Sequence, residues 1–102
     1  MLFRQGDIYI EAVRCVPEGA VEKQDMVLAE GEATGHRHRV RDLRSAMVFV
    51  LGDQIFVDVT ADRAEIVHDE HGTIELNRGV YRVWRQREYD PTPEGNYRYV
   101  FD

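Results

Sequence analysis

The stretch that decides the fold is Ala46-Met47-Val48-Phe49-Val50-Leu51-Gly52-Asp53-Gln54-Ile55-Phe56-Val57-Asp58-Val59-Thr60. Two runs of β-branched and aromatic residues flank a Gly-Asp dipeptide, which is a strong signal for a two-residue β-hairpin. The register then pairs Val50 with Ile55, Phe49 with Phe56, and Val48 with Val57. Both faces of this hairpin are apolar. We therefore expect all six side chains to be largely buried, inside a sandwich or at a subunit contact.

Further short strands are predicted on both sides of the hairpin, separated by turns rich in Gly, Pro and Asp. The predicted strands are residues 8–16, 26–29, 36–41, 64–67, 73–76, 80–89 and 97–101. The predicted turns and loops include residues 5–7, 61–63, 77–79 and 90–95. No window has a helical period of useful length. The pattern predicts an all-β fold with little or no helix: one antiparallel barrel or sandwich domain spanning residues 1–102.

Composition narrows the classes of function. The net charge of −6 argues against general nucleic-acid binding, which requires a basic surface. The only cysteine, Cys15, excludes an internal disulfide and a thiolate zinc site. Because Cys15 falls in an apolar strand pattern, we expect it to be a small buried side chain.

The N-terminal residues and the apolar runs bear on localisation. Met1-Leu2-Phe3 is followed by polar residues, so no apolar signal-peptide region is present. No apolar run approaches the roughly 18 residues of a membrane span. We expect a soluble, cytoplasmic protein.

All four histidines of the chain fall in two tight pairs. His36 and His38 alternate with Arg37 and Arg39, so in a strand the two imidazoles share one face and the arginines the other. The second pair lies in His68-Asp69-Glu70-His71-Gly72. If the pairs belong to one site, at least one of His68 and His71 should lie beside the first pair.

Three interpretations of the histidines remain open. In the first, His36, His38, His68 and His71 bind a divalent metal such as Zn, Fe, Ni or Mn. An oxygen ligand could then come from Asp42, Asp69, Glu70 or Glu88. In the second, the histidines line an anion or substrate pocket with Arg37, Arg39, Arg85, Arg87 and Glu88. In the third, they are exposed loop residues of an interaction module that forms a homo-oligomer, plausibly a homodimer, or binds a protein partner.

The sequence does not decide whether the protein is an enzyme. Ser45 is the only serine, and no Gly-x-Ser-x-Gly surrounds it. A metal-dependent reaction with an open coordination position is the form of catalysis to expect.

Rings and guanidinium groups are interleaved in residues 81–89 and 97–99. One interpretation is a stacking platform for a nucleotide or RNA. The other is an antiparallel pair held by cross-strand Arg–aromatic and Arg–Glu contacts, which the negative net charge favours.

Two resemblances can be stated on these residues. Gly31-x4-His36-x-His38-x3-Asp42, followed by Gly52 after a strand, resembles the first motif of the cupin superfamily. The stretch matching the second cupin motif is residues 77–82, with Asn77 at the proline position and Arg82 at the histidine position. This resemblance covers roughly half the chain and implies a small jelly-roll barrel with an internal site. The chain is also similar to small uncharacterised bacterial β-proteins with a Gly-His-x-His segment and an Arg-Gln-Arg-Glu-Tyr strand.

Overall fold

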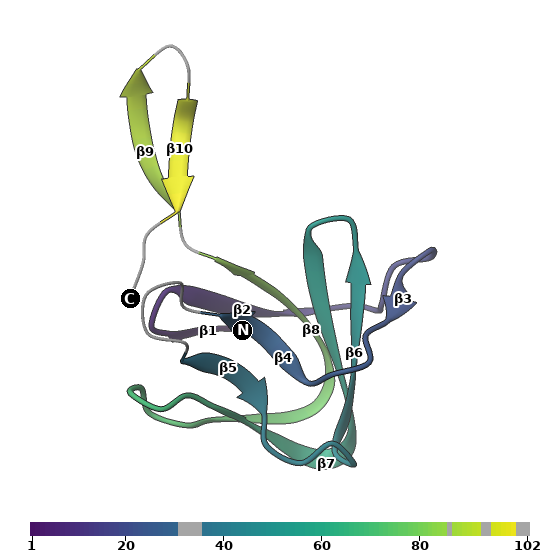
Figure 1. Cartoon of the computed structure of the whole chain (residues 1–102). Coiled ribbons are helices and arrows are strands. Elements are labelled where there is room, and N and C mark those ends of the chain that lie inside the picture. Colours follow the sequence, from purple (N-terminus) through teal and green to yellow (C-terminus); the bar gives the residue numbers. More distant parts are fainter. Residues whose placement is uncertain (31–35, 86, 93–94, 100–102) are drawn as a thin grey trace.

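The protein is an all-β chain in its computed structural model, as the sequence predicts (Figure 1). The structure describes residues 1–30, 36–85, 87–92 and 95–99, the last two ranges as backbone only. Its strands are β1 (Leu2–Gln5), β2 (Ile8–Val13), β3 (Val21–Glu22), β4 (Val27–Glu30), β5 (Arg37–Val40), β6 (Ala46–Leu51), β7 (Gln54–Val67), β8 (Ile74–Arg85), β9 (Arg87–Thr92) and β10 (Gly95–Tyr99). Within these ranges there is no helix able to span a membrane.

The main sheet is antiparallel and curls into a half-barrel (Figure 1). Its strands follow the order β1-β2-β8-β7-β5-β4. The long strand β7 pairs on one side with β8, and on the other side with β6 along its first half and β5 along its second half. β9 and β10 form a separate two-stranded sheet.

The register of the predicted hairpin is confirmed, since Phe49 pairs with Phe56 across β6 and β7 and Leu51 pairs with Gln54. Its burial is only partly as expected. Val48, Phe56 and Val57 are buried, whereas Phe49, Val50 and Ile55 remain partly exposed. Phe56 is buried although it lies outside the main core cluster, so both faces of this hairpin do exclude water at its centre.

Two of the predicted turns are bends inside continuous strands. Residues 61–63 belong to β7, and residues 77–79 belong to β8. The pairing shifts between Val59, which faces Gly79, and Arg63, which faces Asn77. β7 thus carries extra residues opposite Arg78, as in a β-bulge, and Gly79 has a positive φ of 149° that other residues rarely adopt. Both strands bend here without breaking, which curls the sheet.

The ends of several strands differ from the prediction as well. β2 stops at Val13, so Cys15 is exposed and is not a buried side chain. The strand predicted for residues 80–89 is divided between β8 and β9, and the loop predicted for residues 90–95 lies mostly within β9 and β10.

The turn predicted at residues 5–7 is confirmed, whereas the strand before it, β1, was missed. β1 and β2 form a hairpin in which Gln5 pairs with Ile8 across the two-residue turn Gly6-Asp7. Gly6 has a φ of 58°, whereas the φ of Asp7 is not positive, which is the pattern of a type II′ turn.

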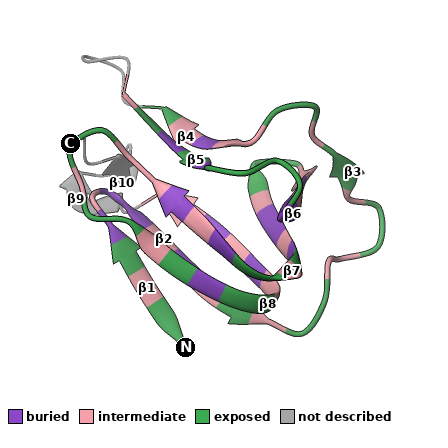
Figure 2. Cartoon of the chain, turned by 90° about the horizontal axis from the view of Figure 1, so that it is seen from below, coloured by how far each residue is buried: buried purple, intermediate pink, exposed green. Residues whose placement is uncertain are grey.

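The apolar core lies on the inner face of the half-barrel, where buried residues alternate along β2, β7 and β8 (Figure 2). Its fully buried members are Ile8, Ile10, Val40, Val48, Val57, Val59, Ile66 and Leu76. Tyr81 closes the core near the bend, where its hydroxyl donates to the carbonyl of Asn77 at 2.8 Å. Burial raises the pKa of Tyr81, so this hydroxyl stays neutral and remains a donor.

We predict that Phe56→Ala lowers the free energy of unfolding by about 3–5 kcal/mol, the usual cost of removing a buried phenylalanine. Phe49→Ala should cost clearly less, because the partly exposed ring gains less on folding. Urea unfolding of both variants measures the difference. Equal losses of unfolding free energy in the two variants would show that the Phe49 ring is as well buried as the Phe56 ring, which would contradict the structure.

Candidate functional site

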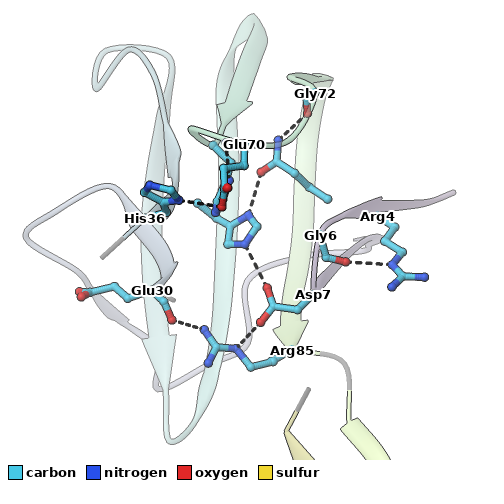
Figure 3. A network of polar contacts seen from close by, with 11 residues as sticks. Arg4, Gly6, Asp7, Glu30, His36, Glu70, Gly72 and Arg85 are labelled. Atoms are coloured by element: carbon cyan, nitrogen blue, oxygen red, sulfur yellow. Dashed lines mark hydrogen bonds and ion pairs between the residues drawn. The ribbon is translucent and has the colours of Figure 1, made fainter. Parts of the chain in front are cut away.

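Three segments meet at one end of the sheet (Figures 1 and 3). They are the Gly6-Asp7 turn with its flanking Gln5, the start of β5 at residues 36–38, and the connection between β7 and β8 at residues 68–73. Side chains from all three are joined by hydrogen bonds. Hydrogen-bonded polar groups from all three segments therefore lie together at this end of the half-barrel, beside the apolar core.

The two histidine pairs do meet in space. The ring centroid of His68 lies 4.3 Å from that of His38, 4.5 Å from that of His71 and 5.7 Å from that of His36. His38 and His71 are nearly parallel, with ring centroids 6.1 Å apart. The predicted proximity is thus confirmed, and His68 is the centre of a four-histidine cluster.

His38 is the buried member of this cluster, with 1% of its surface exposed. Its Nδ1 lies 2.9 Å from Gln5 Oε1, and its Nε2 lies 3.1 Å from Asp7 Oδ1. The Gln5 amide orientation follows from its nitrogen, which donates to two backbone carbonyls and so leaves the oxygen facing His38. Both His38 nitrogens thus face acceptors, and both hydrogen bonds form only when each nitrogen carries a proton. We therefore infer that His38 is an imidazolium.

Asp7 links this imidazolium to an arginine (Figure 3). Its Oδ2 lies 3.2 Å from Arg85 Nε, and Arg85 also donates to the carbonyl of Glu30 at 2.5 Å. Only 4% of the Asp7 side chain is exposed, and only 18% of Arg85. The carboxylate therefore stands between two cations in a nearly water-free setting. These contacts join the β1–β2 turn, β5, β8 and the end of β4.

His36 belongs to the outer part of the cluster and points toward Glu70 (Figure 3). Its Nδ1 lies 2.9 Å from Glu70 Oε1, so the ring donates to that carboxylate, and its Nε2 lies 3.8 Å from Asp69 Oδ2. The backbone N–H of Glu70 donates to His68 Nδ1 at 3.0 Å. A neutral His68 accordingly carries its proton on Nε2. The outer histidines are thus oriented by two acidic residues of the β7–β8 connection.

Several predicted site residues lie elsewhere. Arg37 and Arg39 are exposed on the face of β5 opposite His38, as the alternation predicts. Asp42 accepts the backbone N–H of Arg44 in its own turn at 2.9 Å, which holds the pKa of that carboxyl below its usual range. The side chains of Arg87 and Glu88 lie outside the described part of the chain.

The described part of the Arg–aromatic strand makes intramolecular contacts. Trp84 stacks on Tyr9 with ring centroids 5.5 Å apart, and the Arg82 guanidinium lies 4.6 Å from the centroid of the Trp84 ring. Arg82 also donates to Glu11, which it faces across the β2–β8 pairing, at 3.0 Å. These contacts favour the interpretation of this strand as a cross-strand ladder.

Gln5 and Asp7 are site residues that sequence reasoning missed. Both are buried, at 2% and 3% exposure, and both bind His38. The local signal is the Gly6-Asp7 dipeptide, which repeats the Gly52-Asp53 turn signal and predicts the turn but not the roles of its side chains. Nothing in the sequence shows that the Asp7 side chain turns inward, whereas Asp53 at the same turn position is exposed.

Comparison with known proteins identifies one family. A family profile described as a domain of unknown function, DUF8820, matches residues 4–86. This range contains both histidine pairs together with Gln5, Asp7 and Arg85. No curated protein and no solved structure matches the chain.

We predict that Asp7→Ala lowers the free energy of unfolding by about 3–5 kcal/mol, because the buried His38 imidazolium loses its anionic partner. Asp7→Asn should cost less, since its amide oxygen can still accept from Nε2. The matched control is Asp53→Ala, at the exposed equivalent position of the other Gly-Asp turn, which should change stability by less than about 0.5 kcal/mol. Similar losses for Asp7→Ala and Asp53→Ala in urea unfolding would contradict the buried ion pair.

Proposed function

The chain belongs to the DUF8820 family, a domain of unknown function, and we propose that it binds a divalent metal ion through the outer three histidines of the cluster. His36, His68 and His71 are the proposed nitrogen ligands. The observation that carries this proposal is the convergence of all four histidines of the chain at one place, from two segments about thirty residues apart.

The surroundings of His36 support a metal ligand. A ligating histidine usually donates its second ring N–H to a carboxylate, as His36 Nδ1 does to Glu70. Two ligand atoms on one tetrahedral zinc ion, each at about 2.1 Å, lie about 3.4 Å apart. The separation of 3.8 Å between His36 Nε2 and Asp69 Oδ2 is close to this value, so Asp69 is the proposed oxygen ligand.

His38 has a different role in this proposal. Its two nitrogens are both committed to acceptors, so it has no lone pair to offer a metal while Gln5 and Asp7 hold it. The proposed ligand set therefore departs from the cupin pattern, in which residues at the positions of His38 and Asp42 would contribute. His38 instead forms the floor against which the ring of His68 lies.

Metal binding requires a local rearrangement. As the side chains stand, no three His, Cys, Asp or Glu residues in the described ranges form a metal centre. His68 would have to turn, or give up its hydrogen bond with the Glu70 N–H, to present a nitrogen toward His36. A set of three imidazoles and one carboxylate suits Zn, Ni, Fe or Mn, and an octahedral ion would keep two positions for water or substrate.

A small anion is the second candidate ligand. With a proton on each nitrogen, His38 is a cation, and Arg85 lies on the far side of Asp7, so these three side chains by themselves hold two cations and one carboxylate. This net positive charge would attract phosphate or a carboxylate to the neighbouring imidazoles.

We predict that Zn²⁺ or Ni²⁺ raises the melting temperature of initially metal-free protein at pH 7.5. At a hundred times Kd the stabilisation should be about 2.7 kcal/mol. Asp69→Asn and His36→Ala should weaken the response, while Asp62→Asn, at an exposed carboxylate of the β7 bulge, should leave it unchanged. A melting temperature indifferent to added metal at this pH would end the metal proposal.

We further predict that pH separates the two ligands. Metal ligation requires neutral imidazoles, whose ordinary pKa is about 6.5, so metal stabilisation should largely disappear at pH 5.5. Protonated imidazoles bind anions better, so stabilisation by inorganic phosphate would instead grow between pH 7.5 and pH 5.5. The direction of change in melting temperature with each ligand decides between them.

A further inference from the structure

Gln5 hydrogen-bonds both to His38 and to the backbone at the two ends of the segment that carries His68 and His71. It is 2% exposed, and each of its three hydrogen bonds reaches a residue far away in the sequence. Its Nε2 donates to the carbonyl of Ile66 at 2.9 Å and to the carbonyl of Gly72 at 2.8 Å, while its Oε1 accepts from His38 Nδ1. All three bonds are satisfied in a single orientation of the amide.

The two carbonyls have a special place in the chain. Ile66 lies just before the end of β7, and Gly72 lies just before β8, so they bracket residues 67–71. That segment carries His68, Asp69, Glu70 and His71, which include every proposed ligand except His36. A primary amide with two N–H groups can bridge two carbonyl oxygens, whereas a carboxylate cannot.

We propose that Gln5 is the positioning residue of the site: its amide clamps both ends of the ligand-bearing segment and holds His38 against the rings of His68 and His71. The effect of Gln5 on metal affinity rests on the proposed function, whereas its hold on residues 67–71 rests on the fold alone. Asp69 and Glu70 are exposed, so the segment gains little from apolar burial, and tying its ends removes conformational freedom that metal binding would otherwise have to remove.

Two substitutions separate the parts of this role. Gln5→Met keeps the length of the side chain and removes all three hydrogen bonds. Gln5→Glu keeps an oxygen for His38 and removes both donors to the segment. The control is Ser45→Ala, which removes a buried hydroxyl that donates to the Asp42 carbonyl at another turn. It should lower stability without touching the site.

The metal readout is Zn²⁺ affinity measured by competition with a chromophoric chelator, under conditions where each variant is folded. Both Gln5 variants should bind about 10–100-fold more weakly than the parent, the usual effect of losing a residue that orients ligands. The added negative charge of Gln5→Glu should by itself favour a cation, so weaker binding by this variant identifies the lost donors as the cause. Ser45→Ala should retain the parent affinity. Affinities of the Gln5 variants within about threefold of the parent would overturn the proposal, because that is far below the loss expected for an orienting residue.

The structural readout needs no metal and no variant. In the metal-free parent, the side-chain N–H protons of Gln5 should exchange with water far more slowly than those of the exposed Gln24 and Gln54. In metal-free Gln5→Met, the backbone amides of residues 68–72 should exchange faster, while Ser45→Ala leaves them unchanged. Fast exchange of the Gln5 amide in the parent would refute the clamp. Slow exchange in a parent that binds no metal would leave the clamp standing and refute the metal proposal instead.

Discussion

The buried ion pair between His38 and Asp7 is the interaction on which this end of the molecule depends. Transferring an imidazolium and a carboxylate out of water costs several kcal/mol for each ion, and their attraction offsets this cost only when the remaining hydrogen-bonding groups are also satisfied. Gln5 and Arg85 supply those partners. Apolar residues of the same volume would serve stability as well or better, so the network is explained better by the site that it shapes than by the stability that it adds.

The fold was predictable wherever pairing is local. The β6–β7 hairpin follows from Gly52-Asp53 and its apolar flanks, because a two-residue turn sets the register of both strands. The bends of β7 and β8 were not predictable in this way. Residues 61–63 and 77–79 carry ordinary turn signals, and only the partner strand decides whether such signals end a strand or bend it. The turn at Gly6-Asp7 was predicted, but the strand before it was missed because β1 is short and its sequence is not strongly apolar.

The sequence predicted that the histidines lie together, but it did not predict what each histidine contacts. At least one of His68 and His71 was correctly expected to lie beside the first histidine pair, since four histidines in two pairs form a pattern that the sequence displays. The role of His38 depends on hydrogen bonds to Gln5 and Asp7, 33 and 31 residues away in the sequence. Glutamine and aspartate are common surface residues, so only the three-dimensional structure distinguishes the two that are buried.

The choice between a cation and an anion at this site is a question of charge arranged in two layers. The inner layer is defined by His38, Arg85 and Asp7, and these three side chains by themselves carry one excess positive charge when His38 is protonated. The outer layer adds the carboxylates of Asp69 and Glu70 beside His36. With the outer histidines neutral, the two layers together hold two cations and three carboxylates, so the two outer carboxylates reverse the sign. A divalent ion would bind next to His38 and Arg85 only because the carboxylates of Asp69 and Glu70 make the total charge negative. Protonation of the outer histidines would cancel their effect, and the same cluster would then present a positive surface to an anion.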